Sequence, residues 1–408
     1  MKPRVLFLSH SASRNGASLE LLYFLRWLKA NVDCDIDILV NGRGPLVDEF
    51  RAIGRTRVCR NATSVPRFLP PRLWAALRPH LERWCVRWPL AGRRFDLVYA
   101  NTAATWQLLG HLLDVAPARL WHIHELEYAL NVLVPESAAD LFRSAATQFV
   151  AASESVRKAL LLRFGLPAGS VDVVSGFVPF PRLSTDEMQT RRGRVMSGLG
   201  WPERTFVIGG CGSLGWRKGT DLFLQIAQIV STTPGYDDVR FLWVGGSQGD
   251  RAALEFQHDL HSLGLEARCL RVAATDDVLD YYCAMDAFAL TSREDPCPLV
   301  LLEAAAQRLP IVCFAESGGG PEFVGIEAGL VAPYMNVAAF AAHLMNLHDD
   351  PVQRARFATI ASDKARTRYS LESQAPRVLE VIERCLAARA ASAGGVLAPD
   401  LSGVTSTK

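Results

Sequence analysis

The sequence predicts an α/β protein built from two Rossmann-like domains, and three observations lead to this prediction. Short apolar runs alternate with amphipathic stretches along nearly all of the chain, which is typical of parallel α/β construction. The alternation breaks once, at residues 179–202, where prolines and charges mix. The length of 408 residues fits about two domains at roughly 100–200 residues each.

Each half of the chain supplies its own series of candidate elements. In the first half we predict strands at 5–8, 36–40, 97–100, 120–123 and 149–152, and helices at 19–28 and 156–164. In the second half we predict strands at 206–208, 241–244, 267–270, 287–290 and 311–314, and helices at 221–230 and 299–308. The predicted organisation is a first domain at 1–180, a linker at 181–204, a second domain at 205–370, a final helix at 371–388 and a flexible tail at 389–408.

The composition excludes several classes of protein. Apolar residues make up 49% and charged residues 21%, so the chain is globular and not wholly disordered. No stretch reaches the roughly 18 apolar residues that a membrane helix needs, and the apolar part of the N-terminus is too short for a secretory signal. The nine cysteines are odd in number and lack a C-x-x-C pair. They argue against a disulfide framework or a structural zinc site and fit a reducing cytosol.

The charge is distributed unevenly. The net charge is only +2, but residues 55–94 contain ten arginines and one acid. A local basic patch on a near-neutral protein does not predict a nucleic-acid binder. Within this patch, residues Arg72–Arg94 form a basic amphipathic stretch with Trp84 and Trp88 at helical spacing. Two interpretations stay open with equal weight: docking to an anionic membrane surface, or packing of the apolar stripe on the first sheet.

The strongest candidate site follows the predicted strand at 287–290. Asp295 precedes Pro298, which suits the start of the helix predicted from Leu299, and Glu303 lies inside that helix. The helix N-terminus offers unpaired backbone N–H groups and can bind a phosphate. The two carboxylates could then accept hydrogen bonds from two parts of a polyhydroxylated ligand. The alternative is that Asp295 only stabilises the helix and Glu303 is solvated, and the spacing alone does not decide.

The segment Thr291–Val312 resembles the signature of the family 4 glycosyltransferases, which are retaining enzymes of the GT-B fold. Two acids separated by seven residues, Asp295 and Glu303, precede a small-residue helix and a further strand. The resemblance implies that Asp295 contacts donor-sugar hydroxyls and that Glu303 holds the nucleotide ribose. Glu294 remains a rival for the first acid, and the S-R-E-D-P run followed by P-L-V resembles one subgroup. The donor site is expected to include the intervening Cys297, Pro298, Leu299 and Val300.

A glycine-rich loop follows the predicted strand at 206–208. Its G-x-G-x-x-G spacing weakly suggests a dinucleotide site, as in an NAD-dependent oxidoreductase, but the next helix starts too late and no acid ends the next strand. The loop instead resembles the glycine loop of the same family. This implies that Arg217 and Lys218 stabilise the leaving diphosphate, with Gly212 and Ser213 also at the donor. Ser213 stands where the family commonly has arginine, and the alternative is a pair of surface cations.

Two further segments resemble family elements. The stretch 316–324 resembles a Gly-Gly-x-Pro-Glu element near the donor, which implies roles for Gly318, Gly319 and Glu322, although an ordinary loop is the alternative. Gly16 lies where the family has a glycine loop after the first strand, and is assigned to the donor.

The run W-H-I-H-E-L carries the candidate catalytic histidine of the first domain. His124 with Glu125 resembles the His–acid pair that the family places close to the reacting sugar, so His124 is predicted to be catalytic. We predict that His122 points to the opposite face of the strand and is structural.

Three aspartates alternate in the run V-D-C-D-I-D. Asp33, Asp35 and Asp37 could bind a metal in a metal-dependent, single-sheet glycosyltransferase. We prefer a solvated edge, because the run leads directly into a core strand. No metal ligands are therefore predicted, and the resembled family needs neither a metal nor a cofactor besides its nucleotide-sugar donor.

The resemblance covers nearly the whole chain and is strongest at 207–324. It implies a GT-B fold whose C-terminal helix crosses back to the first domain, and a cytoplasmic hexosyltransferase, peripheral on the inner face of the membrane. The expected reaction moves a sugar from a UDP or GDP donor to a glycan, polysaccharide or lipid-linked acceptor, with retention, as in lipopolysaccharide synthesis. The alternatives are a nucleotide-sugar epimerase of this fold and an inactive partner in a glycan-assembly complex.

Overall fold

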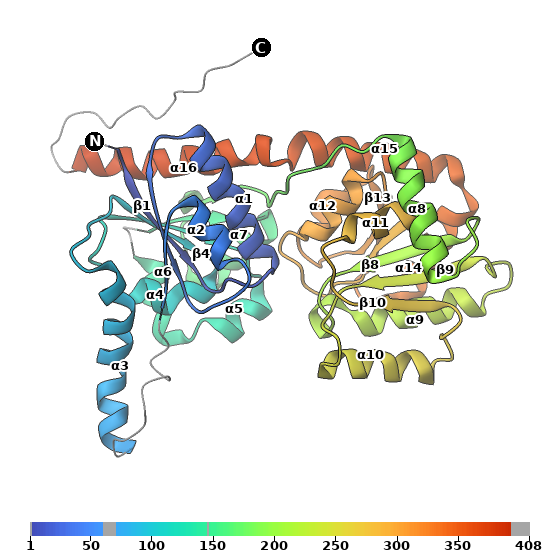
Figure 1. The fold of residues 1–408 in the computed structure, drawn as a ribbon, viewed down its shortest axis with the longest axis horizontal. Helices are drawn as coiled ribbons and strands as arrows, with labels where there is room; N and C mark the ends of the chain where they lie inside the picture. The colour runs from blue at the N-terminus through green and yellow to red at the C-terminus, as the bar shows by residue number, and fades with distance from the viewer. Residues whose placement is uncertain (1, 60–70, 145–146, 393–408) are drawn as a thin grey trace, which may run out of the picture. The chain divides into compact units, whose positions relative to one another are not determined.

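The computed structural model describes residues 2–59, 71–144 and 147–392, without the side chains of 71–76, 78, 79 and 389–392. The chain forms two compact units (Figure 1). The first comprises residues 1–176 together with the C-terminal residues from Leu371 onward, and the second comprises Phe177–Ser370. The residues that we expected to form a flexible tail include 393–408, which lie outside the described part of the chain.

The first unit is built on a seven-stranded parallel sheet in the order β3-β2-β1-β4-β5-β6-β7. Its strands are β1 (Arg4–Ser9), β2 (Asp35–Val40), β3 (Arg55–Val58), β4 (Leu97–Asn101), β5 (Ala118–Ile123), β6 (Thr147–Ala151) and β7 (Val171–Val173). Its helices are α1 (Gly16–Asn31), α2 (Val47–Ile53), α3 (Pro71–Arg87), α4 (Trp106–Gly110), α5 (Glu127–Leu133), α6 (Ala139–Arg143), α7 (Glu154–Phe164) and α16 (Leu371–Ser392). Every residue of β4 is buried, as expected for a parallel strand covered on both faces.

The second unit holds a six-stranded parallel sheet in the order β10-β9-β8-β11-β12-β13. Its strands are β8 (Phe206–Cys211), β9 (Val239–Val244), β10 (Cys269–Val272), β11 (Ala287–Leu290), β12 (Ile311–Phe314) and β13 (Gly329–Ala332). Its helices are α8 (Thr185–Leu199), α9 (Thr220–Thr232), α10 (Arg251–Ser262), α11 (Val278–Ala284), α12 (Leu299–Ala306), α13 (Gly319–Val324), α14 (Val337–Asp349) and α15 (Pro351–Arg368). Short 3-10 turns connect some of these elements: η2 (Trp88–Leu90), η3 (Ala103–Thr105), η4 (Glu136–Ala138), η5 (Ala168–Ser170) and η6 (Trp216–Lys218).

The strand order reverses once in each sheet. In the first sheet β1 pairs with both β2 and β4, and in the second sheet β8 pairs with both β9 and β11. At such a point the connections that follow two neighbouring strands go to opposite sides, which leaves a crevice between the two loops. In folds of this kind ligands bind in this crevice, beyond the carboxyl ends of the strands. The loops after β1, β4, β8 and β11 are therefore the positions at which the fold can build sites.

The residues that we expected as a linker contain a helix of the second unit. Helix α8 packs against α11, and it begins with a capping box in which the Ser184 and Glu187 side chains bond each other's backbone N–H groups. The prolines at 179 and 181 end the irregular stretch just before this cap, and the charges that follow lie mostly on the exposed side of the helix. We therefore mistook a solvated helix for a linker because of its polar composition, although its capping box marks where it begins.

The last helix returns to the first unit, as the sequence predicts. Helix α16 contacts α1 and β5, and its Arg377 and Arg384 bond the Val173 carbonyl and the Asp172 carboxylate of β7. Just before it, Ser370 forms an isolated parallel bridge with Val178. The two places where the chain passes between the units are thus paired through their backbones.

The expectation of a solvated edge is wrong for Asp37, whereas the side chains of Asp33 and Asp35 are 73% and 47% exposed. Strand β2 lies between β1 and β3, and Asp37 is only 3% exposed. Asp37 pairs with Arg93, whereas Asp35 pairs with Arg4 and Asp33 pairs with Lys2. Each aspartate is therefore neutralised by its own cation.

A search of the described residues for a membrane-spanning helix is negative, since none of the helices combines sufficient length with sufficient apolarity.

Candidate functional site

Three loops of the second unit meet at the carboxyl edge of its sheet. The backbone N–H of Arg293, after β11, donates to the carbonyl of Arg217, after β8, at 2.9 Å. Asp295 bonds the loop after β12 in both directions: its N–H donates to Ser317 at 2.8 Å, and its carbonyl accepts from Gly319 at 2.9 Å. Gly318 forms a bridge with Asp295. Residues predicted from three separate motifs are thus brought together at the strand-order reversal.

The Asp295 carboxylate is the centre of an ion cluster. Lys218 Nζ donates to Asp295 Oδ2 at 2.5 Å, and Arg217 Nη1 lies 3.7 Å from Asp295 Oδ1. The Ser292 hydroxyl donates to Oδ2 at 3.1 Å, and Arg217 also donates to the Glu294 carbonyl at 3.0 Å. The two cations therefore converge on the Asp295 carboxylate, and Arg217 also bonds the backbone of Glu294.

Burial and charge act in opposite directions on Asp295. Its side chain is 6% exposed, and burial alone would raise its pKa, but the charges of Lys218 and Arg217 lower the pKa below its usual value. The carboxylate therefore stays ionised at neutral pH. Lys218 and Arg217 bring two positive charges close to α12, whose N-terminus adds its own positive dipole end. This edge of the sheet suits a phosphate-bearing ligand.

Arg293 holds the cation-bearing turn in place, and the sequence analysis missed it. Its guanidinium, 7% exposed, forms a bidentate pair with Asp221 at 2.7 and 2.8 Å and donates to the Trp216 carbonyl at 2.7 Å. The guanidinium also lies over the Trp216 ring, 5.4 Å from its centre. Its partners come from η6 and α9, about 70 residues earlier in sequence, so no local pattern could reveal the role.

Glu303 lies in α12 with a partner that the sequence did not indicate. The Tyr282 hydroxyl, from α11, donates to Glu303 Oε2 at 2.9 Å. Burial raises the pKa of Glu303 to about 7, although the bond from Tyr282 opposes this rise. The carboxyl group therefore titrates near physiological pH and is not simply solvated, as the alternative interpretation would require.

Close backbone approach explains two glycines of the site. A Cβ on Gly219 would lie 2.0 Å from the Thr291 carbonyl oxygen, and one on Gly319 would lie 2.3 Å from the Pro296 carbonyl oxygen. Gly212 adopts φ 139°, with the Lys218 side chain packed beside it. These positions let the three loops touch through their backbones.

The other predicted residues of this unit lie around the cluster. Pro298 is buried and is the N-cap of α12, so it precedes the first helical residue and does not occupy that position itself. Leu299 and Val300 lie in the first turn of the helix. Ser213 and Glu322 are exposed, and Cys297 is half-buried.

The first unit presents a second group of polar side chains at the carboxyl edge of its own sheet. Gly16 begins α1, capped by Asn15, and Asn101 ends β4. The Asn101 amide donates to the Ala17 carbonyl at 2.9 Å, and its oxygen bonds His124 Nε2 at 3.1 Å. The predicted catalytic histidine is thus held among α1, β4 and β5.

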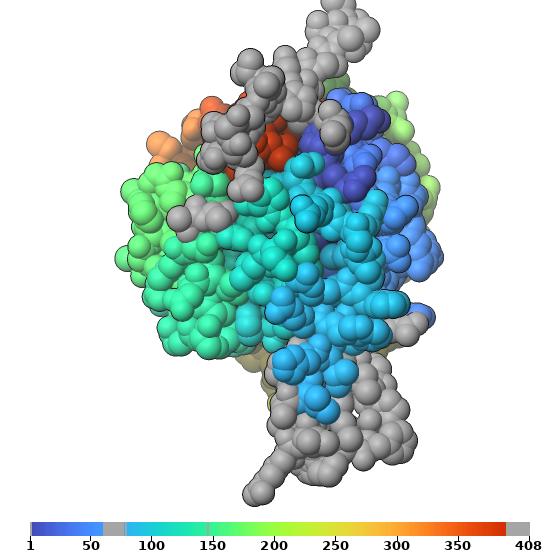
Figure 2. Space-filling view, turned by 90° about the vertical axis from the view of Figure 1, so that its left-hand side faces the viewer, coloured from blue at the N-terminus to red at the C-terminus, as the bar shows by residue number. Residues whose placement is uncertain are grey.

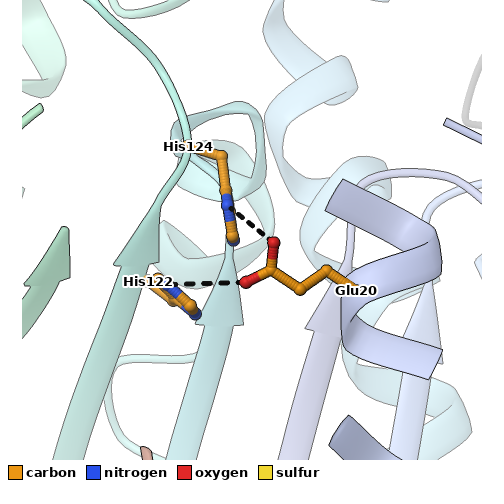
Figure 3. Close-up of side chains that lie close together, drawn as sticks. All are labelled: Glu20, His122 and His124. Atoms are coloured by element: carbon orange, nitrogen blue, oxygen red, sulfur yellow. Dashed lines mark ion pairs between the residues drawn. The ribbon is translucent and has the colours of Figure 1, made fainter. Parts of the chain in front are cut away.

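The predicted orientation of His122 is wrong. Figure 3 shows His122 and His124 on the same side of the sheet, both directed toward Glu20 of α1. Their ring centres are 4.1 Å apart. Residues two apart along a strand share a face, because side chains alternate with a period of two. Glu20, which had no sequence signal, therefore joins a cluster with both histidines.

The sequence of this chain is similar to those of known glycosyltransferases. Residues 205–350 match the family described as "Glycosyl transferases group 1". D-inositol 3-phosphate glycosyltransferase of Kineococcus radiotolerans is 28% identical over 329 residues, covering 74% of this chain and 75% of that protein. The lipopolysaccharide core biosynthesis glycosyltransferase LpsD of Rhizobium meliloti is 26% identical over 224 residues, covering 54% of this chain and 59% of that protein. The chain thus spans three quarters of the first relative and less than two thirds of the second.

Solved structures share the fold. Anabaena HepE, crystallised with UDP and glucose, superposes with a TM-score of 0.76 and 21% identity over 93% of this chain and 98% of its own. The architecture of two parallel α/β units is therefore the GT-B fold, as the sequence predicts.

The close approach at Gly219 gives a test of the loop packing. Gly219→Ala should lower the free energy of unfolding by about 3 kcal/mol or more, because the new methyl group would overlap the Thr291 carbonyl. The matched control is Gly264→Ala, since Gly264 has φ 67° against 65° for Gly219 but open space around its Cβ position. The control should cost only about 1–2 kcal/mol. Equal losses in urea denaturation would contradict the packing described here.

Proposed function

We propose that this chain, whose residues 205–350 match the group 1 glycosyltransferases, transfers a hexose from a nucleoside diphosphate sugar to an acceptor hydroxyl. The observation that carries the proposal is the ion cluster of Asp295, Lys218 and Arg217 beside the N-terminus of α12. Neither the epimerase nor the inactive-partner alternative is favoured by any contact of the described residues.

The donor is proposed to be of the UDP or GDP type, bound along α12. Its diphosphate would face Arg217, Lys218 and the first turn of the helix, which carry the positive charge. Its ribose would face Glu303, whose ionised carboxylate accepts hydrogen bonds from two neighbouring hydroxyls. Glu303 comes four residues after Leu299, the first residue of this eight-residue helix. One rigid element would therefore present both the diphosphate contact and the ribose contact. HepE was crystallised with UDP, which agrees with a uridine donor.

The proposed chemistry is transfer with retention and without a metal or other cofactor. The bond between the sugar C1 and the diphosphate oxygen breaks, and its electron pair stays on the phosphate, where Lys218 and Arg217 stabilise the charge. The acceptor oxygen bonds C1 on the face that the phosphate leaves, and its proton passes to the departing phosphate oxygen. Asp295 is engaged by Lys218 and Ser292, so it orients the cation and the sugar hydroxyls rather than attacking C1.

The remaining predicted residues are proposed to complete the donor and acceptor contacts. Gly212, Ser213 and Gly318 lie in the loops that follow β8 and β12, and Gly319 and Glu322 lie in α13, which follows the second of these loops. In the first unit, Gly16 and His124 lie at the edge of the sheet where the acceptor would bind. Turning His124 toward a sugar would require its Nε2 to exchange the bond to Asn101 for one to the ligand.

The acceptor is proposed to be a glycan or lipid-linked saccharide at the cytoplasmic face of a membrane. Helix α3 runs away from the sheet of its unit, and its C-terminal part is visible at the surface (Figures 1 and 2). Trp84 and Trp88 are 54% and 65% exposed, and their rings lie 5.4 Å apart. Arg83 is exposed beside them, whereas Cys85 and Val86 on the other side are buried. The exposed stripe, with its arginines, suits an anionic interface.

Nucleotide binding tests the donor site directly. A thermal-shift panel with UDP, GDP, ADP, CDP and NAD should show one nucleoside diphosphate stabilising the protein, by about 2.7 kcal/mol at a hundred times its Kd. Glu303→Gln should weaken that binding by about tenfold or more, since hydrogen bonds to a charged group are lost. The control Glu327→Gln removes an exposed carboxylate of the same unit and should change nothing. Stabilisation by NAD alone would contradict the proposal.

The same site should give a characteristic pH dependence. The pKa of Glu303 is raised to about 7, so the carboxyl group is mostly protonated at pH 6 and mostly ionised at pH 8. Only the ionised form accepts both ribose hydroxyls, and nucleotide affinity should therefore rise about tenfold from pH 6 to pH 8. Because the phosphate also titrates, the comparison is with Glu303→Gln, in which this component should vanish. An identical pH profile in the two proteins would exclude Glu303 from ribose binding.

Turnover tests the proposed chemistry. Lys218→Met should lower kcat by about 10²–10³-fold by removing one group that stabilises the leaving phosphate. The exposed Lys158 provides the matched control, Lys158→Met, which should keep wild-type turnover. The anomeric configuration of the product, measured by NMR, should equal that of the donor. An inverted product would overturn the same-face mechanism even if the donor site is correct.

Vesicle binding tests the role of α3. Vesicles containing phosphatidylglycerol should retain the protein in a flotation assay, and neutral phosphatidylcholine vesicles should retain it less, because anionic lipids attract the arginines. Replacing both Trp84 and Trp88 by alanine should release it. Leu254→Ala serves as a control, since Leu254 is 66% exposed on α10 of the other unit. Unchanged flotation of the double variant would exclude α3 as the docking surface.

A further inference from the structure

Three ionisable side chains of the first unit converge without bonding one another. Glu20 comes from α1, His122 from β5, and His124 from the residue after Ile123, which ends that strand. Glu20 Oε1 lies 4.0 Å from His122 Nε2, and Glu20 Oε2 lies 3.9 Å from His124 Nδ1 (Figure 3). One ligand atom from each residue lies within 4.8 Å of the other two. The group is therefore too open for direct hydrogen bonds and compact enough to surround one small ion.

Two atoms of this cluster are buried and have no hydrogen-bond partner in the described part of the chain. They are Glu20 Oε1 and His122 Nε2, on side chains that are 4% and 2% exposed. An unsatisfied buried polar atom costs about 1–3 kcal/mol, so two such atoms directed at one point need an explanation. A bound cation would satisfy both.

The bonds of Asn101 fix the tautomer of His124. Its amide nitrogen must be the atom that faces the Ala17 carbonyl, because a carbonyl oxygen only accepts hydrogen bonds. The Asn101 oxygen therefore accepts from His124 Nε2, which carries the proton. Nδ1 of His124 is then left with its lone pair directed toward Glu20. This is the arrangement in which a histidine coordinates a metal, with its other nitrogen donating to an outer partner.

His122 has an outer partner in the same way. Its Nδ1 lies 2.7 Å from the Tyr99 hydroxyl, which leaves Nε2 facing Glu20. The Tyr99 ring is itself buried against Phe7 and Phe24, so the hydroxyl has a fixed position. Each histidine is thus held at one nitrogen and presents the other to the same point.

The protonation states of the group agree with this geometry. Burial lowers the pKa of His122, and burial followed by the nearby His10 lowers that of His124 to about 3, so both imidazoles are neutral and able to coordinate. Burial raises the pKa of Glu20.

We propose that Glu20, His122 and His124 form a binding site for one divalent transition-metal ion of the zinc type. Two imidazole nitrogens and one carboxylate oxygen are a ligand set that zinc prefers, and water would fill the fourth tetrahedral position. Ligand atoms in such a site are roughly 3.3 Å apart, given metal–ligand distances of about 2.0–2.1 Å. The observed separations of 4.0 and 3.9 Å run to the two different oxygens of Glu20, and one ligand atom from each residue lies within 4.8 Å of the other two, so side-chain rotations on binding would have to draw the three atoms together. The ion would tie α1 to β5 and hold the ring of His124.

Zinc titration of the chelator-treated protein tests the site without reference to turnover. Calorimetry with zinc chloride should show one tight site per chain. Glu20→Gln, which keeps the shape of the side chain, should weaken binding by about a hundredfold, and Asn101→Ala should weaken it by about tenfold through loss of the outer partner. The control His261→Ala removes the exposed His261–Glu266 pair, which is the obvious adventitious site, and should leave the tight site intact.

Cobalt provides a measurement that needs no variant. Co²⁺ added to the wild-type protein should give the visible absorption of a four-coordinate site with nitrogen and oxygen ligands. Strong near-ultraviolet thiolate-to-metal absorption would instead assign the ion to cysteines. The proposal is overturned by that spectrum, by the absence of stoichiometric zinc binding in the wild-type protein, or by unchanged binding in Glu20→Gln.

Discussion

The carboxylate of Asp295 is the contact on which the second unit's site depends. Its side chain attracts Lys218 and Arg217, while its own N–H and C=O groups bond the loop after β12. One residue therefore joins the loops that follow β8, β11 and β12. A buried carboxylate is tolerated only when its charge is compensated, and here the compensation fixes the positions of Lys218 and Arg217. Asp295 therefore both compensates the charges of the two cations and holds the three loops in place.

Much of the fold could be predicted from the sequence, because parallel strands that are buried on both faces consist of continuous apolar runs. The strands β1, β4, β8 and β11 follow from such runs, and the predicted site residues lie mainly in and next to the loops after them. The edge strand β3 was missed because its residues alternate between charged and small side chains, with only partial burial. Helix α8 was missed because a solvated helix has the composition of a linker.

The candidate sites were predictable only where residues close in sequence act together. Asp295 and Glu303 share one segment, and their spacing carried the resemblance. Arg293, Tyr282 and Glu20 were missed because each is defined by a partner from a distant element: Asp221, Glu303 and the two histidines respectively. Such pairings depend on which loops the sheet brings together, and no local pattern encodes them. The error at His122 was different in kind, since the period of a strand already placed it beside His124.

The bridge between Val178 and Ser370 makes the second unit an insertion whose two ends meet. A segment of nearly two hundred residues leaves and re-enters the first unit at paired backbone positions. The ends of the second unit are therefore already adjacent in space. The second unit thus begins and ends at neighbouring positions, as a domain inserted into another domain does. The second unit could be exchanged between relatives as a cassette, with 177 and 370 as the natural points of ligation.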